Sequence, residues 1–578
     1  MRITRKNFFL LIIFGLTFLG ACHLPIREDE NPLTLEEMYD QIRATLESTN
    51  STGNTSQQSQ NPTQTGVIED SAIDPTKIYL HPGLPMSFDQ NNDLTKYLQT
   101  DKKDDADIKV LMGSPKSDDN EITNINIWVY ALAAPFYTIH DNVNQQELEE
   151  LWRGERRSLG SISIIYVTES TKEAVSTILG PAEESNVTVI SMEAMEDIPL
   201  DDSQALMILP FDALNKKMKV IRVDGQAPID KDFDPLEYPL SIAIWIESDL
   251  DDHTIRIPES NYDPSLQTIL VMTGVTAMTR ATAYRMEIMG NQYPGQDIVD
   301  WLTSADLTHI SNEVPFAANC PTPDPVQQNL IFCSSPSRVE LLEYVGADII
   351  ELSGNHLLDY GLEAVNLTLK MYEERGWETY AGGWDLADSQ SPAIVDHNGN
   401  RLAFLGCNSV GPPNAWASTS KPGSAPCGDF SWMTKEIQRL KEDGYLPIVT
   451  LQYAEDYTSY PSVQMAADFQ MLADAGAVVV NGSQAHTPKM MAFQGESFLH
   501  YGLGNLFFDQ MEVYYNDVYL SGTRDEFIDR LTFYDGDLIS IELLTALLED
   551  YARPRPMNTS EREAFLSRIL LTALEFDR

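Results

Sequence analysis

Short apolar runs and amphipathic stretches alternate along residues 76–258. The apolar runs have the length and composition of buried strands, and the stretches between them have helical spacing. The expected strands are 125–133, 161–167, 187–191, 205–209 and 241–246, and the expected helices include 145–153 and 170–179. This alternation predicts an α/β domain.

The second half of the chain, from about residue 265, contains six apolar runs that each lead into polar residues. These runs are 268–273, 306–310, 347–352, 446–451, 477–480 and 499–502. In α/β sheets, ligands bind where the C-terminal ends of the strands converge. We therefore predict one polar site, formed by Asn312, Glu313, Asn355, His356, Gln452, Glu455, Gln484, His486 and Asn505.

The N-terminus has the pattern of an export signal. Basic residues at 2, 5 and 6 precede an apolar stretch, 8–19, that is short for a membrane span and ends before Cys22. The segment resembles a bacterial lipoprotein signal, which implies lipidation of Cys22 and attachment to the extracytoplasmic face of the cell membrane. A plain signal anchor with a chance cysteine is the alternative.

A short helix and a linker are expected between this signal and the first domain, over residues 23–75. Residues 33–47 have helical spacing, and 49–66 contain only Ser, Thr, Asn, Gln, Gly and Pro. Such a composition is typical of a flexible tether. The expected organisation is thus a signal over 1–22, this linker, a domain over 76–258 and a second domain over 265–578.

Four cysteines follow the signal, and an even number in an exported protein indicates two disulfides. Proximity in the sequence favours Cys320–Cys333 and Cys407–Cys427, although three pairings are open. Their spacing does not fit a zinc knuckle. We expect these cysteines to be structural.

The net charge excludes one class of partner. The chain has 39 Lys and Arg against 87 Asp and Glu, which gives −48. A surface of this sign repels phosphates, so nucleic acid and anionic lipid headgroups are not expected as partners through a basic surface. The charge is compatible with cationic ligands or metals, and equally with a soluble extracellular surface.

The first domain is similar to periplasmic solute-binding proteins of the phosphate type. The resemblance rests on short motifs at 130–136, 151–154, 209–212 and 223–225, in the order that these proteins have. No Ser/Thr-Gly phosphate cradle is apparent, so no ligand is implied. A structural α/β module is an equal alternative.

The second domain resembles the CapA proteins of poly-γ-glutamate capsule biosynthesis, a branch of the calcineurin-like metallophosphoesterases. The motifs that carry the resemblance are VMTGVTAMTR (271–280), 305–313, LSGNHLLDYG (352–361), 381–385, TLQYAEDYTSYP (450–461), AGAVVVNGSQAH (475–486) and YGLGNLFFDQ (501–510). The resemblance implies an α/β sandwich of the metallophosphoesterase type. It also implies a role in the biosynthesis, export or retention of an anionic surface polymer.

Several metal-ligand positions of that family are substituted. Val275 stands where the family has Asp, Gln452 where it has His, and Ser483 and Gln484 where it has two His. The ligands that remain by resemblance are Glu313, Asn355, His356 and His486. Because neutral amide oxygens are poor ligands for a transition metal, we expect a divalent metal to bind weakly, if at all.

By the same resemblance, His356, His486 and Glu455 are the candidate catalytic residues. The candidate binding residues are Asn312, Glu313, Asn355, Asp385, Gln452, Gln484 and Asn505. Structural roles compete with these: His356 could anchor a turn, residues 359–361 are expected to cap the following helix, and Asn505 is expected to fix its turn.

The sequence thus predicts an exported lipoprotein with two α/β domains and a degenerate metal site. Its ligand would be an anionic polymer or a small molecule. Two alternatives stay open: an active metal-dependent phosphoesterase or hydrolase, and a cell-surface binding module without catalysis.

Overall fold

The computed structural model describes residues 76–114, 123–248, 250, 253–327, 329–511, 513–515, 518–520 and 522–577. They form two compact units, one up to Pro264 and one from Ser265. The expected signal, Cys22 and the linker lie outside the described residues. No helix in the described part is long and apolar enough to span a membrane.

The first unit is built on a mixed sheet with the strand order β2-β1-β3-β11-β4-β8-β6-β7, and β9 pairs with β4. Its strands are β1 (Lys77–Leu80), β2 (Leu98–Gln99), β3 (Ile108–Gly113), β4 (Thr123–Pro135), β6 (Ile164–Val167), β7 (Val187–Val189), β8 (Ala205–Pro210), β9 (Met218–Val220) and β11 (Ser241–Ser248). A small pair consists of β5 (Asn142–Val143) and β10 (Arg222–Val223). The helices are α3 (Met86–Asn91), α4 (Gln145–Trp152), α5 (Glu169–Leu179) and α6 (Met192–Glu196).

Local sequence explains where the longer helices of this unit begin. The side chain of Asn144 accepts a hydrogen bond at the first turn of α4, and that of Thr168 does the same for α5. Both are residue types that favour the N-cap position. All five expected strands and both expected helices are present with small shifts at their ends, so the prediction of an α/β fold for this part is confirmed.

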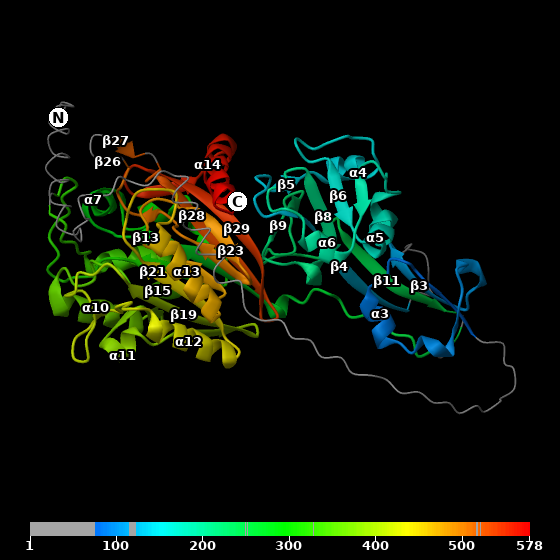
Figure 1. The fold of residues 1–578 in the computed structure, drawn as a ribbon, viewed down its shortest axis with the longest axis horizontal. Helices are drawn as coiled ribbons and strands as arrows, with labels where there is room; N and C mark the ends of the chain where they lie inside the picture. Colours follow the sequence, from blue (N-terminus) through cyan, green and yellow to red (C-terminus); the bar gives the residue numbers. More distant parts are fainter. Residues whose placement is uncertain are drawn as a thin grey trace. The chain divides into compact units, whose positions relative to one another are not determined.

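The second unit contains two larger sheets (Figure 1). In the first, β12 (Gln267–Thr273), β14 (Leu307–Asn312), β15 (Ile349–Glu351) and β16 (Glu378–Tyr380) run parallel, and β28 (Asp525–Tyr534), β29 (Asp537–Glu549) and β30 (Arg553–Pro556) continue it antiparallel. The short strand β13 (Val275–Thr276) pairs with the C-terminal end of β14, and β25 (Asn505–Phe507) pairs with β13 on its other side.

The second sheet of this unit has the order β18-β19-β21-β22-β24-β23. Its strands are β18 (Ala393–His397), β19 (Asn400–Asn408), β21 (Leu446–Gln452), β22 (Val479–Asn481), β23 (Met491–Gln494) and β24 (Ser497–His500). The central four strands are parallel, so their C-terminal ends lie at one edge. The short pairs β17 (Gly382–Gly383) with β20 (Gly423–Ser424), and β26 (Val513–Tyr515) with β27 (Val518–Leu520), complete the strands.

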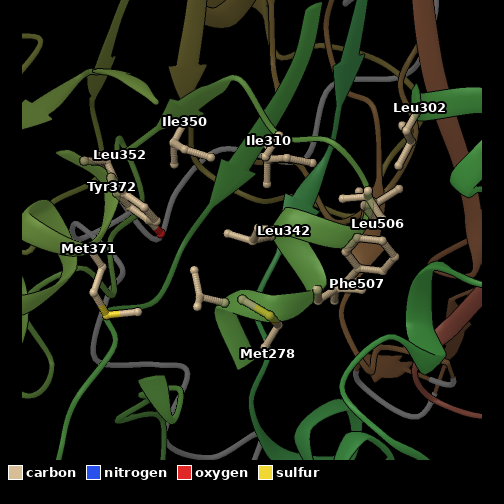
Figure 2. Packing of buried hydrophobic residues seen from close by; sticks show 14 of the residues in the cluster. Met278, Leu302, Ile310, Leu342, Ile350, Leu352, Met371, Tyr372, Leu506 and Phe507 are labelled. Carbon is tan, nitrogen blue, oxygen red and sulfur yellow. The ribbon is translucent and has the colours of Figure 1, made fainter. Parts of the chain in front are cut away.

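Helices cover the outer faces of both sheets. The helices α7 (Arg280–Met289), α8 (Val299–Thr303), α9 (Val339–Tyr344) and α10 (Gly361–Glu373) supply side chains to a core shared with the first sheet. Figure 2 shows part of this core, where Ile310 and Ile350 of the strands lie with Leu342 of α9 and Met371 of α10. The helices α12 (Ser431–Glu442) and α13 (Val463–Ala475) contact the second sheet, α11 (Leu386–Ser389) contacts β17, and α14 (Thr559–Asp577) contacts β23.

Polar side chains join the two sheets on their facing sides. Thr450 of β21 donates to the hydroxyl of Tyr380 at 2.9 Å, and this hydroxyl lies 2.8 Å from Nε2 of His309. His500 of β24 bonds Asp529 of β28 through Nδ1 at 2.7 Å. All five of these side chains are buried. The second unit is therefore an α/β sandwich whose interface is held by buried hydrogen bonds as well as apolar packing.

Both expected disulfides are present. Cys320 bonds Cys333, and Cys407 bonds Cys427. The first closes a loop before α9, and the second joins the end of β19 to the loop that precedes α12. The prediction of structural cysteines is confirmed.

Candidate functional site

The candidate site lies where β13, β14 and β25 end side by side. Val275 pairs with Ser311 of β14 and with Asn505 of β25, so the position of the substituted carboxylate lies between these two strands. Gly274 permits this close approach, because a Cβ there would lie 2.0 Å from the carbonyl oxygen of Gly504. The side chain of Val275 is fully buried and brings no charge or oxygen to the site.

Glu313 and the turn that carries His356 are packed against each other by a glycine. Glu313 follows β14, and its backbone N–H donates to the carbonyl oxygen of Thr276 at 2.9 Å. A Cβ at Gly354 would lie 2.7 Å from Cα and 2.8 Å from the carbonyl oxygen of Glu313. Only glycine allows this contact, so Gly354 brings the Asn355–His356 turn next to Glu313.

A carboxylate orients His356. Its Nδ1 lies 2.7 Å from Oδ2 of Asp359, and this same oxygen accepts the backbone N–H of Phe332 at 2.8 Å. Nδ1 therefore carries the proton, and Nε2 keeps its lone pair when the ring is neutral. Burial lowers the pKa of His356, but the hydrogen bond that Nδ1 donates to Asp359 and the negative charges of Glu313 and Asp359 outweigh the effect of burial. The pKa of His356 lies above its ordinary value of 6.5 as a result, although Arg280 opposes this rise.

An amide orients His486. Its Nδ1 lies 2.8 Å from Oδ1 of Asn505, whose Nδ2 donates to the backbone carbonyls of His486 and Thr523 at 3.2 and 2.9 Å. Because Nδ2 is the donor, Oδ1 must accept from Nδ1 of the histidine. The backbone N–H of His486 donates to Oε2 of Glu455 at 2.5 Å.

Arg280 links the two histidines through aromatic rings. Its guanidinium lies over Phe332 at 5.2 Å and over Phe508 at 4.9 Å from the ring centroids. The ring of His356 lies 4.6 Å from Phe332, and the ring of His486 stacks on Phe508 at 5.1 Å. The loops after β15 and β22 are thus joined into one stack by a cation between two aromatic faces.

Tyr457 connects Glu455 to the same place. Its backbone N–H donates to Oε1 of Glu455 at 2.7 Å, and its hydroxyl accepts a hydrogen bond from Gln510 at 3.3 Å. Burial raises the pKa of the Tyr457 hydroxyl, and the negative charges of Glu455 and Glu313 add to this rise. Glu313, His356, Glu455, His486 and Asn505 are thereby linked by contacts and electrostatic interactions around one site.

Residues 269–510, which contain this whole arrangement, match the family described as bacterial capsule synthesis protein PGA_cap. The resemblance to the CapA family is confirmed. The chain is 23% identical over 277 residues to the capsule biosynthesis protein CapA of Bacillus anthracis, a match that spans 47% of this chain and 67% of that protein. It is 24% identical over 173 residues to the PGA biosynthesis protein CapA of Bacillus subtilis, which spans 30% of this chain and 45% of that protein.

Solved structures were also compared with the chain. An ABC-type phosphate transport receptor from Vibrio cholerae is 14% identical with a TM-score of 0.24, and covers 31% of this chain and 88% of that one. A putative 5'-nucleotidase from Staphylococcus aureus is 10% identical with a TM-score of 0.27, and covers 53% and 58% of the two chains. At TM-scores this low, neither structure informs the function of this chain.

The substituted ligand positions of the PGA_cap region are bonded within the protein. Nε2 of Gln484 donates to the hydroxyl of Ser311, and the hydroxyl of Ser483 donates to the buried carboxylate of Glu351. Burial disfavours the charge of Glu351, but its hydrogen bonds with His309, Ser353 and Ser483 lower its pKa overall. Ser483 and Gln484, which the sequence resemblance predicts at ligand positions, thus serve as internal hydrogen-bond donors.

Six buried amide oxygens of the PGA_cap region have no hydrogen-bond partner among the described residues. They are Oδ1 of Asn312, Asn355 and Asn481, and Oε1 of Gln452, Gln484 and Gln510. An unpaired buried acceptor costs free energy, so each of these oxygens has capacity for a donor from a ligand or water. Four of the six, at Asn312, Asn355, Gln452 and Gln484, belong to candidate positions predicted from the sequence.

Two predicted site residues have structural roles. Asp385 is the N-cap of α11, where its Oδ1 accepts the backbone N–H of Asp388 at 3.0 Å. Asn312 is buried, and its Nδ2 donates to the carbonyl of Val314 and to the hydroxyl of Tyr372, both at 2.8 Å.

The expected capping segment, 359–361, does lie at the start of the next helix, but the side chain of Asp359 does not cap it. Helix α10 begins at Gly361 with Tyr360 as its N-cap and has no side-chain cap, whereas Asp359 holds His356. Sequence reasoning also assigned no role to Arg280, Phe332 or Phe508. The spacing of His356 and Asp359 within one turn was the available signal for the first contact, but the aromatic stack joins segments that are far apart in the sequence.

Among the described residues of the PGA_cap region, the side chains that could hold a transition metal do not converge. Across the described ranges, no three His, Cys, Asp or Glu side chains gather closely enough to hold a metal ion. The other oxygens nearby are neutral amides, which bind such metals weakly.

Proposed function

We propose that this protein takes part in the biosynthesis, export or retention of a poly-γ-glutamate-like surface polymer, and that its second unit acts by binding rather than by metal-dependent catalysis. The match of residues 269–510 to the PGA_cap family and the likeness to CapA proteins support the polymer. The matches span 67% of the Bacillus anthracis protein and 45% of the Bacillus subtilis protein. For this chain, the activity of those whole proteins is therefore only proposed.

The loss of predicted metal ligands is the observation that favours binding over catalysis. Val275 places a buried apolar side chain where the resemblance predicts a carboxylate, and Nε2 of Gln484 donates to the hydroxyl of Ser311. A two-metal hydrolase needs ligands on both sides of the reacting group to stabilise the attacking and leaving oxygens. With Val275 and Gln484 unavailable as ligands, we infer that the site keeps its polar groups but cannot hold two metal ions around a reacting group.

We also propose that the protein itself is exported and anchored by a lipid, on the basis of residues 1–22. The two disulfides support export, because disulfides form in oxidising compartments. Replacing Cys22 by Ser is expected to release the protein from membranes or to block its processing. Fractionation of cells that express each form measures this. Unchanged partition of the variant into membranes would contradict a lipid anchor.

The rival function is a metal-dependent phosphoesterase or hydrolase. Its support is that Nε2 of both His356 and His486 is left for a ligand, and that the oxygens of Asn355 and Gln452 have no partner among the described residues. His356, His486, Glu313 and Asn355 would have to move together to ligate a single ion, because these His and Glu side chains do not gather closely enough in the structure to hold one. A lone ion could polarise a substrate, but it would stabilise only one side of a transferring group.

Metal content and restored ligands distinguish the two functions. We expect the purified full chain to contain little zinc, manganese or iron by mass spectrometry, and to hydrolyse phosphoesters and γ-glutamyl bonds slowly. The triple variant Val275→Asp, Gln452→His and Gln484→His should bind Zn²⁺ or Mn²⁺ about tenfold more tightly or better, because it adds a carboxylate and two imidazoles.

The matched control places the same three substitutions outside the site, as Val410→Asp, Gln390→His and Gln494→His. It should leave metal affinity unchanged. Thermal melting of each variant checks that it folds. Stoichiometric metal and fast hydrolysis in the unaltered protein would overturn the binding function and support the rival.

A further inference from the structure

A pocket beside the candidate site is lined by two arginines. It is a small hollow that is partly open to solvent, and its polar lining consists of Thr279, Arg280, Thr322, Gln327, Arg338 and Tyr360. The Cys320–Cys333 disulfide forms part of its wall. None of the described residues that line it is Asp or Glu, although acids outnumber bases 87 to 39 in the whole chain.

Arg338 is a buried cation with little compensation from the protein. It is 3% exposed, and its one hydrogen bond to a described residue goes from Nη2 to Oε2 of Glu287 at 3.2 Å. The Glu287 side chain is 59% exposed, so water screens this pair. A guanidinium has five N–H donors, and a buried charge is costly unless it is paired and hydrogen-bonded.

Arg280 brings the second guanidinium to the same pocket. Its φ is +46°, a left-handed conformation that costs about 1–2 kcal/mol outside glycine and fixes where the side chain leaves the backbone. Nη2 donates to Asp509, but the buried Nε has no partner among the described residues. Arg280 also lies between Phe332 and Phe508, so one residue belongs to both the pocket and the candidate site.

We propose that this pocket binds a carboxylate of an anionic polymer, held by Arg338 and Arg280. A planar guanidinium matches a carboxylate through two parallel hydrogen bonds. The choice of a glutamate carboxylate rests on the proposed function, whereas the need for an oxyanion rests on the two arginines alone. The pocket also resolves a conflict of charge, because it offers a polyanion a local cationic site on a protein of net charge −48.

The binding of a fluorescent γ-linked glutamate oligomer to the full chain, measured by anisotropy at low and high salt, tests this proposal. Arg338→Gln should weaken binding about tenfold or more, as expected for the loss of a charge-assisted hydrogen bond. The matched control is Arg439→Gln, which removes the same charge from an exposed arginine paired with Glu436 and Asp443. Its affinity should be that of the unaltered chain.

A second variant acts in the opposite direction and does not depend on a buried substitution. Glu287→Gln removes the resident partner of Arg338, so oligomer binding should tighten by about two- to threefold, in line with an exposed pair. Glu436→Gln removes the corresponding partner of Arg439 and should have no effect. If Arg338→Gln binds the oligomer as tightly as Arg439→Gln, and Glu287→Gln as tightly as Glu436→Gln, the proposal that this pocket binds the carboxylate is wrong. Binding of the polymer elsewhere on the chain would still stand.

Two further outcomes separate the ligand from the function. If inorganic phosphate binds in a manner that depends on Arg338 but the glutamate oligomer does not bind, the assignment of a carboxylate is wrong. If the unaltered chain binds neither the oligomer nor phosphate at low salt, the pocket is overturned, whatever the result of the metal experiment. Competition by an α-linked glutamate oligomer would show that single carboxylates, not the γ-linkage, are recognised, as this pocket predicts.

Discussion

The two histidines of the candidate site follow parallel strands in different sheets, and the protein holds them in different ways. His356 follows β15 and bonds the carboxylate of Asp359 through Nδ1 at 2.7 Å. His486 follows β22 and bonds the amide of Asn505 through Nδ1 at 2.8 Å. In both, Nε2 is left for a ligand, but only the first has a negative partner.

This difference separates two tasks that a neighbouring residue can perform. A carboxylate both orients an imidazole and stabilises its protonated form, which is part of why the pKa of His356 is raised. An amide fixes orientation and adds no charge. Outer partners of this kind decide which nitrogen of a histidine faces a ligand. The His356 side is thus adapted to carry charge near Glu313, and the His486 side to hold a fixed geometry.

The largest effect is expected when the amide partner is made acidic. Asn505→Asp gives His486 the kind of partner that His356 has, but it removes the N–H groups that serve the carbonyls of His486 and Thr523. A buried carboxylate would then face two carbonyl oxygens. We expect a loss of about 3 kcal/mol in the free energy of unfolding, measured with urea.

Asn398→Asp is the matched control for this substitution. Asn398 is exposed, and its Nδ2 donates to a single carbonyl, that of Gln267, at 2.7 Å. Its loss should be about 1 kcal/mol or less, because water can solvate the groups left unpaired. Equal losses at the two positions would contradict the structural role assigned to Asn505.

The next effect concerns the contact that brings Glu313 to His356. Gly354→Ala places a methyl group against the backbone of Glu313, at 2.7 Å from its Cα, so one of the two loops must shift. We expect a loss of about 2 kcal/mol in the free energy of unfolding, together with a changed NMR titration of His356.

Gly376→Ala separates this contact from backbone strain. Gly376 has a φ of +70° and no atom within 4 Å of an added Cβ, so only the strain of a left-handed alanine applies. Its loss should be about 1 kcal/mol, with the titration of His356 unchanged. If Gly354→Ala also leaves that titration unchanged, the packing of Glu313 against the His356 turn does not influence the imidazole.

The sequence predicted the strands and the places where they end, because apolar periodicity reports burial directly. The expected run 446–451 is β21, Leu446–Gln452, which lies parallel to β19. The disulfide pairs followed from proximity in the sequence. These features depend on local composition and on the general geometry of α/β sheets.

Contacts between distant loops could not be predicted in the same way. Arg280, Phe332 and Phe508 come from three separate segments, and their stack depends on side-chain packing and on a left-handed residue that periodicity does not report. Asp385 was selected by its place in a motif, but locally it favours an N-cap, and that preference prevailed. At Asp359 a long-range contact prevailed over a local preference. Its Oδ2 accepts the backbone N–H of Phe332 and lies beside His356 instead of capping the helix.

The smallest effect is expected when the acidic partner is made an amide. Asp359→Asn gives His356 the kind of partner that His486 has and keeps a hydrogen bond to Nδ1. The pKa of His356 should fall, because the charge that stabilises its protonated form is removed. NMR titration of the imidazole Cε1–H measures this, with His356→Gln used to assign the signal.

The same substitution should change stability in one range of pH. The folded-state pKa of His356 is raised above its unfolded value of 6.5, so the stability it contributes is fully present below pH 6.5 and is lost as pH rises through the folded pKa. The difference in unfolding free energy between the unaltered chain and Asp359→Asn should therefore be about 1 kcal/mol near pH 5.5 and smaller near pH 8.5. A difference that stays the same between pH 5.5 and pH 8.5 would mean that Asp359 mainly holds the backbone of Phe332, because that hydrogen bond does not depend on the charge of the imidazole.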